Sequence, residues 1–373
     1  MDGNGGTADG LLTIGAFARA CRLSPKALRL YDDLGLLTPD RVDPYNGYRR
    51  YAPAQLERAR LVALLRRLGM PLARIREVCE LAPGPAAEAV AAYWAQVEAD
   101  TAARRDLAAF LVDQLTRKDH TVMTTSGTPV PPPLPLTMRC AAGTDRGLVR
   151  PANQDAAYAG PRLLAVADGC GEQGGPAAAA AIDALKPLED TDPAIGDPLT
   201  ALEEAARRAD RAAPAADGAT GCTLTALLRS GSRLGLLHVG DSRAYVLRDS
   251  GLFRITHDHS VVQSLIDEGR LTPEEAPSHP DRALLLRALG GGTEFAPDLQ
   301  LLEARPGERY LLCTDGLWGV VPADAMRDVL TAAPGPEDAV RHLIALAHEA
   351  GAPDNVGCAV GEVRVARGDG SGD

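Results

Sequence analysis

Five aspartate residues stand at the ends of apolar runs or inside tight turns in the C-terminal part of the sequence: Asp155, Asp168, Asp241, Asp315 and Asp354. Three of them follow apolar runs that predict buried strands, as LLAVA does before Asp168. A carboxylate that follows a strand lies at the rim of a sheet, and several carboxylates at one rim repel one another unless cations lie between them. The pattern therefore predicts a site for Mg²⁺ or Mn²⁺, which bind oxygen ligands.

The spacing also indicates which reaction such a site would serve. Two divalent cations close together can ionise a water molecule for in-line attack on phosphorus. Arg150 lies five residues before Asp155 in the run RPANQD. A single Asp-Gly pair is most often only a turn, but an ordered set of five aspartates behind Arg150 is poorly explained by turns alone.

The elements that position these residues are predicted to be strands, because residues 138–365 form short β-rich runs that end in Asp-Gly or Gly-Asp pairs. Residues 119–137 hold five prolines and predict an extended linker. Residues 86–118 lack Gly and Pro and predict one long helix. A seam of period 3.5 on this helix, weakened in its middle by Thr101 and Arg104, indicates a coiled coil between two copies of the chain, although packing on its own domain is the alternative. The seam consists of Val90, Trp94, Val97, Thr101, Arg104, Ala108, Leu111 and Leu115.

Residues 11–80 show short helical patterns separated by turn signals. Thr13 can cap a first helix, and Ser24 followed by Pro25 has the residue types favoured at the start of a second helix over residues 26–34. Two helices joined by a tight turn form a helix-turn-helix unit, whose second helix enters the major groove of DNA. The Asn46-Gly47 pair then predicts a hairpin, whose basic returning strand would form a wing against the phosphate backbone.

Charge is distributed unevenly along the chain. Residues 11–80 hold 13 Lys and Arg against 7 Asp and Glu, a net charge of +6, whereas the whole chain carries −11. A basic N-terminal segment on an otherwise acidic chain indicates a polyanion-binding module joined to a part that does not bind polyanions. A solvated basic surface without a ligand is the alternative explanation of the charge alone.

Three spaced motifs make the N-terminal part resemble the MerR family of transcription regulators: ALRLYDDLGLL at residues 27–37, GYRRY at 47–51 and LGMPLARIR at 68–76. The resemblance covers about residues 11–118 and implies a dimer, joined by an antiparallel coiled coil, on palindromic promoter DNA. Leu30 departs from the family, which often has a tyrosine there, and Cys79 alone cannot form a soft-metal site. The implied DNA contacts are Lys26, Arg29, Tyr31, Tyr48, Arg49 and Arg50.

The ordered aspartates and the run TDRGLVR at residues 144–150 resemble the metal-dependent protein phosphatases of the protein phosphatase 2C type. The resemblance implies a sandwich of two antiparallel sheets flanked by helices, and residues 256–290 are similar to the flap of bacterial members. It implies that Asp168, the Gly169 carbonyl, Asp315 and Asp354 hold two ions, and that Asp241 with Asp315 holds a third. Asp155 would orient water, Arg150 would bind the phosphate, and no phosphoenzyme would form.

Some residues depart from that family pattern or leave two explanations open. Gln154 stands where the family often has an acid, and Cys170 begins an altered stretch after Gly169. Cys170 could be oxidised or bind a thiophilic metal, or it could simply pack. Likewise, His238, His257 and His259 could donate protons or could form structural hydrogen bonds.

The sequence therefore predicts a multidomain chain: a mainly helical winged helix-turn-helix domain at residues 11–82, the dimerisation helix at 86–118, the linker at 119–137 and an α+β phosphatase domain at 138–366. We expect a DNA-binding phosphoserine and phosphothreonine protein phosphatase. One alternative is a regulator whose phosphatase-like domain only senses metal or a phosphoprotein. Another is a phosphatase whose N-terminal module serves only for dimerisation or contact with another protein. The seven scattered cysteines, and the absence of a signal peptide or membrane-spanning run, indicate a cytoplasmic protein without a membrane partner.

Overall fold

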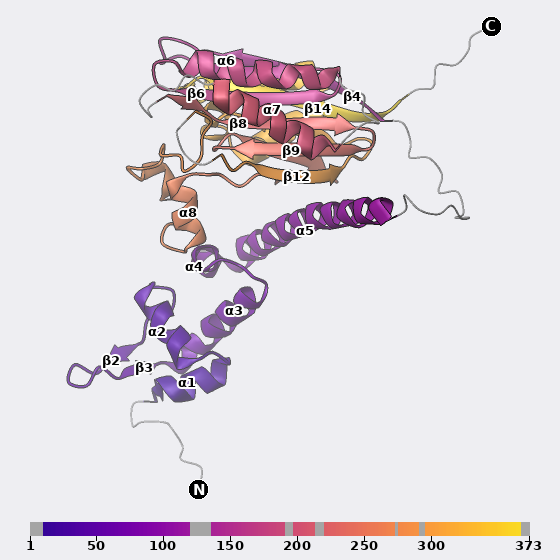
Figure 1. Ribbon diagram of the computed structural model, residues 1–373. Coiled ribbons are helices and arrows are strands. Elements are labelled where there is room, and N and C mark those ends of the chain that lie inside the picture. The colour runs from indigo at the N-terminus through magenta and orange to yellow at the C-terminus, as the bar shows by residue number, and fades with distance from the viewer. Residues whose placement is uncertain are drawn as a thin grey trace. The chain divides into compact units, whose positions relative to one another are not determined.

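The structure is a computed structural model that describes residues 10–119, 136–190, 197–212, 220–272, 275–290 and 295–366 (Figure 1). The chain separates into two compact units. One contains the N-terminal residues up to Ala95 together with Ser264–His279, and the other contains Gln96–Gln263 and the chain from Pro280 onward.

The N-terminal unit begins with the two helices that the capping residues predict. Helix α1 covers Ile14–Cys21, and the Thr13 hydroxyl accepts a hydrogen bond from the backbone N–H of Ala16 at 3.3 Å. Helix α2 covers Pro25–Asp33, and the Ser24 hydroxyl accepts from the N–H of Ala27 at 3.0 Å. Both predicted N-caps are confirmed, and Pro25 occupies the first turn, where a missing N–H costs nothing.

The predicted wing is an antiparallel hairpin in a three-stranded sheet of order β1-β3-β2. The strands are β1 (Leu12–Thr13), β2 (Arg41–Val42) and β3 (Arg49–Tyr51). At the turn the Asn46 side chain accepts a hydrogen bond from the N–H of Tyr48 at 3.0 Å, which supports the hairpin signal in the sequence. Tyr51 anchors the wing because its fully buried ring stacks on Phe17, with 4.5 Å between the ring centroids.

Three further helices follow, namely α3 (Leu56–Arg67), α4 (Leu72–Glu80) and α5 (Pro83–Asp119). The long helix predicted at residues 86–118 is thus confirmed as a helix that begins three residues earlier, with prolines confined to its first turn. Several side chains in the second half of α5 lie outside the description. They include four of the predicted seam residues: Arg104, Ala108, Leu111 and Leu115.

The predicted linker falls mostly outside the described residues, because the description resumes at Leu136. Its predicted ends need correction. Residue 119 is the last residue of α5, and residues 136 and 137 already belong to strand β4 (Leu136–Asp145). Strand β4 pairs with the last strand over its whole length, and this long-range pairing leaves no signal in local composition.

The C-terminal unit contains two antiparallel sheets, of order β11-β10-β13-β14-β4 and β12-β9-β8-β6-β5, with β7 paired to β6. The remaining strands are β5 (Asp155–Ala159), β6 (Leu163–Cys170), β7 (Gly221–Cys222), β8 (Leu224–Ser230), β9 (Arg233–Val239), β10 (Arg243–Arg248), β11 (Gly251–Arg254), β12 (Asp298–Glu303), β13 (Arg309–Cys313) and β14 (Val356–Val365). Side chains such as Val166 and Leu227 from one sheet and Leu312 and Ala359 from the other form the core between them.

Helices cover the outer faces of both sheets. They are α6 (Gly174–Leu185), α7 (Pro198–Ala212), α9 (Asp315–Trp318), α10 (Ala323–Ala332) and α11 (Pro336–Glu349). A further helix, α8 (Val261–Asp267), lies within the segment that the sequence predicts to be the flap. Helices α6 and α7 share one apolar core with β6, β8 and β9, and Figure 1 shows them across that sheet. Helices α9 to α11 share another core with β13 and β14. The predicted sandwich of two antiparallel sheets flanked by helices is confirmed. No helix among the described residues is long and apolar enough to cross a membrane.

Candidate metal centre

Two of the five aspartates lie directly opposite each other on neighbouring strands. Asp155 is the first residue of β5 and pairs in register with Asp168 near the end of β6. Residues directly opposite in an antiparallel pair have side chains on the same face. The two carboxylates therefore start from adjacent positions at one edge of their sheet.

The other three aspartates belong to the connections of the strands around them. Asp241 lies in the turn between β9 and β10, Asp315 opens α9 directly after β13, and Asp354 precedes β14. The register of β10, β13 and β14 aligns Arg243, Cys313 and Cys358, so these connections leave the sandwich at the same end. The sequence places each carboxylate at a strand end, and the pairing of the strands brings all five together.

The electrostatics of the site follow from this crowding. Burial, and then repulsion from Asp315 and Asp155, raise the pKa of Asp168 well above its usual value. Burial raises the pKa of Asp155 and of Asp241 to about 7, and burial together with the charge of Asp354 raises that of Asp315. The Asp168 carboxyl also lies within hydrogen-bonding reach of Asp155 and Asp315. Without cations, the cluster therefore holds protons at neutral pH that isolated carboxylates would have lost.

Two buried threonines, which the sequence reasoning missed, hold the first pair of aspartates. The Thr314 hydroxyl donates to Asp155 Oδ2 at 2.7 Å and accepts from the N–H of Gly357 at 2.8 Å. The Thr223 hydroxyl accepts from the N–H of Asp168 at 3.0 Å. A buried hydroxyl that both donates and accepts fixes the carboxylate that it contacts. Thr314 directly precedes Asp315 in the sequence, which is the signal that could have identified it.

Arg150 contacts one of the proposed metal ligands. Its Nη2 lies 2.5 Å from Asp354 Oδ2, and 53% of its side chain is exposed, so the guanidinium borders the acidic cluster and remains open to solvent.

Asn355, which the sequence reasoning also missed, fixes the backbone around this site. Its Oδ1 accepts from the N–H of Gln154 at 2.8 Å, and its Nδ2 donates to the carbonyls of Arg146 and Ala152 at 2.8 and 2.9 Å.

The loop after Asp168 explains one departure from the family pattern. The Gln154 amide donates to the carbonyl of Gly171 at 2.7 Å, which an acid could not do at neutral pH. Gly169 packs so closely that a Cβ there would lie 2.1 Å from the carbonyl oxygen of Gly174. Cys170 is exposed, and its Sγ lies 3.4 Å from the carbonyl oxygen of Gly221. Gln154 therefore has a structural role suited to this altered loop.

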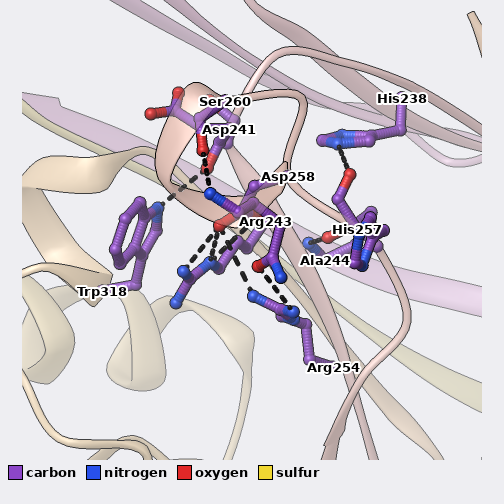
Figure 2. Close-up of polar contacts among 12 residues, drawn as sticks. His238, Asp241, Arg243, Ala244, Arg254, His257, Asp258, Ser260 and Trp318 are labelled. Carbon is purple, nitrogen blue, oxygen red and sulfur yellow. Dashed lines mark hydrogen bonds and ion pairs between the residues drawn. The ribbon is translucent and has the colours of Figure 1, made fainter. Parts of the chain in front are cut away.

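Two of the three histidines form structural hydrogen bonds beside the Asp241 turn. His238 is buried, and its Nε2 lies 3.0 Å from the His257 carbonyl oxygen. That nitrogen must donate, so in the neutral ring Nδ1 accepts from the Thr225 hydroxyl at 2.9 Å. Burial lowers the pKa of His238 to about 4, which keeps the ring neutral at pH 7. Nδ1 of His259 accepts from the N–H of Gly240 at 3.2 Å. These contacts favour the structural explanation over proton donation, and Figure 2 shows the His238 contact.

The chemistry of the donor set fits hard divalent cations. Every side-chain donor in the cluster is a carboxylate oxygen, and a cation bound among these groups would offset the mutual repulsion that raises the pKa of Asp168. Within the described part of the chain, no group of three or more His, Cys, Asp or Glu side chains is arranged to hold an ion by itself. Mg²⁺ is typically bound by one or two carboxylates and keeps several waters, so the donors suit such ions without forming a closed protein cage.

The predicted DNA contacts lie on α2 and on the wing. Lys26 and Arg29 are exposed one turn apart on α2, and Tyr48 is 66% exposed at the wing. Arg49 and Arg50 are half-buried on β3, and Arg49 Nε lies 2.6 Å from Asp32 Oδ2, which ties the wing to α2. Tyr31 is 5% exposed and lies in the core of this unit, a packing position that leaves little of the ring for a DNA backbone.

Comparisons with known proteins agree with both parts. Residues 12–82 match the model of the MerR HTH family regulatory proteins, and residues 157–265 match that of protein phosphatase 2C. The crystal structure of the serine/threonine phosphatase PstP/Ppp of Mycobacterium tuberculosis is 47% identical, with a TM-score of 0.58, over 61% of this chain and 99% of that one. The chain belongs to the protein phosphatase 2C family.

The curated relatives of this protein phosphatase 2C chain match it over only part of their own length. The M. tuberculosis serine/threonine protein phosphatase PstP is 49% identical over 237 residues, which cover 61% of this chain and 45% of the relative. The serine/threonine phosphatase stp of Listeria welshimeri is 35% identical over 136 residues, which cover 36% of this chain and 54% of the relative. The chain thus spans about half the length of these relatives. A further structure, of the catalytic domain of PstP with two manganese ions, is 44% identical with a TM-score of 0.57 and covers 61% of this chain and 99% of that one.

Proposed function

We propose that the chain is a DNA-binding protein with a metal-dependent phosphoserine and phosphothreonine protein phosphatase activity. The observation that carries this proposal is the set of buried carboxylates, with raised pKa values, that share one edge of the sandwich beside Arg150. The family membership supports it, and so does the relative solved with two manganese ions. The MerR-type domain at the other end of the chain supplies the DNA-binding part.

Each residue has a proposed role in this reaction. Asp168, the Gly169 carbonyl, Asp315 and Asp354 would hold two Mn²⁺ or Mg²⁺ ions, and Asp241 with Asp315 would hold a third. When bound, such ions lower the pKa of water and offset the charge of a phosphate ester.

The remaining site residues act on the substrate and on water. Arg150 would bind the phosphate oxygens, which compete for the guanidinium that now pairs with Asp354. Asp155 would orient a water molecule, and the Thr314 hydroxyl fixes the plane of its carboxylate. No covalent phosphoenzyme is expected, because water is the nucleophile.

The first experiment measures hydrolysis of p-nitrophenyl phosphate and of a phosphothreonine peptide by the full chain with Mn²⁺. We expect turnover that disappears in Asp168→Ala and without the metal. Asp183→Ala is the matched control, because Asp183 is exposed on α6 and pairs only with the nearby Lys186 among the contacts described. A folded wild type that turns over neither substrate would refute the activity and favour a phosphoprotein-sensing or metal-sensing regulator.

We also infer that the chain binds promoter DNA as a homodimer joined through α5. The phosphate backbone or base edges would be contacted by Lys26, Arg29, Tyr48, Arg49 and Arg50. We also infer a cytoplasmic location. Sedimentation analysis of the full chain at micromolar concentration tests the dimer. A strictly monomeric protein would exclude the coiled-coil interpretation of residues 86–118.

A further inference from the structure

Trp318 connects two of the proposed metal ligands. It is the last residue of the short helix α9, which opens with Asp315, and its indole Nε1 donates to the main-chain carbonyl of Asp241 at 3.0 Å. Figure 2 shows the indole beside the turn that carries Asp241. One hydrogen bond therefore joins the helix of one carboxylate to the turn of the other.

The indole is itself fixed by a buried ion pair. The Arg243 guanidinium lies over the Trp318 ring, 3.4 Å from its centroid. Asp258 binds that guanidinium through Nη2 at 2.6 Å and through Nε at 3.1 Å, and the side chains of Arg243 and Asp258 are only 19% and 5% exposed. A guanidinium that stacks on a ring and is held by a carboxylate has little freedom to move. Figure 2 shows this stack of Trp318, Arg243 and Asp258.

The turn around Asp241 is otherwise built from contacts to other elements. Gly240 has φ +101°, its N–H donates to His259 Nδ1 at 3.2 Å, and its carbonyl accepts from the His259 N–H at 2.8 Å. The Ser242 hydroxyl lies 2.7 Å from that of Thr223. These contacts fix the turn against the loop that carries His259 and against Thr223, which directly precedes β8, and Trp318 supplies its connection to α9. The hydrogen bond from Trp318 to the Asp241 carbonyl fixes the main chain of this turn relative to α9, and the Asp241 and Asp315 side chains extend from these two fixed segments.

We propose that Trp318 is a positioning residue that sets the separation of the Asp241 and Asp315 carboxylates, so that this pair can hold a divalent cation beyond the two-ion core. Arg243 and Asp258 keep the indole in place. The inference rests on the proposed function, because it concerns how well one of the proposed ions is held. It adds to that function a residue that binds neither metal nor substrate.

Trp318→Phe tests this role, because phenylalanine keeps an aromatic ring for Arg243 but removes the N–H donor. Mn²⁺ binding to the metal-free full chain is followed by calorimetry and by electron paramagnetic resonance of free Mn²⁺. We expect the weakest-bound Mn²⁺ to lose about ten-fold in affinity, which is the effect of one hydrogen bond, while the tighter ions keep theirs. Trp94→Phe is the matched control, since Trp94 lies in α5 and is 44% exposed.

A spectroscopic readout checks the same point independently of binding heats. The chain has two tryptophans, so Trp94→Phe leaves Trp318 as the only one. A paramagnetic Mn²⁺ ion held by Asp241 and Asp315 should quench Trp318 fluorescence in the last phase of a titration. Adding Asp241→Asn should abolish that phase and leave the earlier ones.

The outcomes separate the inference from the function on which it rests. Wild-type stoichiometry and affinity in a folded Trp318→Phe protein would overturn the positioning role, and so would an unchanged stoichiometry in Asp241→Asn. If Trp318→Phe does not fold, Arg243→Lys replaces it as the test, because lysine keeps the charge but cannot pair with Asp258 through two nitrogens or stack as a plane. A wild type that binds no Mn²⁺ would refute the proposed function, and the inference with it.

Discussion

The Thr314 hydroxyl donates a hydrogen bond to the Asp155 carboxylate at 2.7 Å, although 159 residues separate the two in sequence. We expect Thr314→Val, which keeps the shape and removes the hydroxyl, to lower the free energy of unfolding by about 1–3 kcal/mol, because it leaves a buried carboxylate and the Gly357 N–H without this partner. The hydrogen bond lowers the pKa of Asp155, so its loss should also move the acidic limb of the activity profile to higher pH. Thr314→Ser retains the hydroxyl and serves as the control. Urea denaturation and pH–rate profiles provide the measurements.

The acidic cluster predicts how stability depends on pH in the absence of divalent cations. Burial raises the pKa of Asp155 and Asp241 to about 7 in the folded chain, against about 3.9 in an unfolded chain. The folded state then binds more protons between these values, so this contribution to stability is complete below about pH 4 and is lost as the pH rises through about 7.

Denaturation in EDTA should therefore show the free energy of unfolding falling by at least about 1.4 kcal/mol between about pH 5 and pH 8, relative to the Asp155→Asn, Asp241→Asn double variant. Mn²⁺ should reverse the slope, because the proposed ligand carboxylates, Asp241 among them, must lose their protons to bind it. Equal pH dependence in both proteins would show that the carboxylates titrate normally.

His238 predicts the opposite dependence. Burial lowers its pKa to about 4 in the folded chain, against about 6.5 when unfolded. Its contribution is complete above about pH 6.5 and is lost as the pH falls through about 4, because the unfolded chain then binds the extra proton. The stability difference between wild type and His238→Gln should shrink by up to roughly 3 kcal/mol across that range. A constant difference would mean that the imidazole keeps an ordinary pKa, and taking the difference removes the contribution of the aspartates.

Gly147 is predicted to be needed for the geometry of Asp354. It has φ +72°, and a Cβ there would lie 2.1 Å from the Asp354 carbonyl oxygen. Gly307 also has a positive φ, +88°, but a Cβ at that position would meet nothing within 4 Å. We expect Gly307→Ala to lose only the roughly 1–2 kcal/mol of a left-handed alanine. Gly147→Ala should lose more and should weaken Mn²⁺ binding, measured by calorimetry. Equal effects of the two substitutions would contradict the steric argument.

The exposed face of α2 is predicted to contact DNA phosphates or base edges. Lys26→Ala and Arg29→Ala should each weaken binding to the protein's own promoter. Where the lost contact is to a phosphate, the plot of log binding constant against log salt concentration should become less steep by about 1. Lys186→Ala is the control, because Lys186 is an exposed basic residue of the other unit. Unchanged mobility-shift titrations for both N-terminal variants would place the DNA-contacting surface elsewhere.

The sequence by itself determined the features that depend on neighbouring residues. Thr13, Ser24 and Pro25 specify helix starts, Asn46-Gly47 specifies a hairpin, and alternating apolar runs specify strands. The five aspartates could be recognised because each stands at the end of such a run, where a side chain reaches a sheet rim. These signals were enough to predict both domains, their order and the acidic residues of the candidate site.

The tertiary structure decided what depends on which distant segments meet. The pairing of β5 with β6 and of β13 with β14 brings the carboxylates to one edge, and only then do Thr314, Asn355 and Trp318 acquire their partners. Tyr31 likewise belongs to the core because of how α2 packs, which its own motif does not reveal. Strand pairing and packing depend on contacts between residues far apart in sequence, so a local pattern can name the groups of a site but cannot say what holds them.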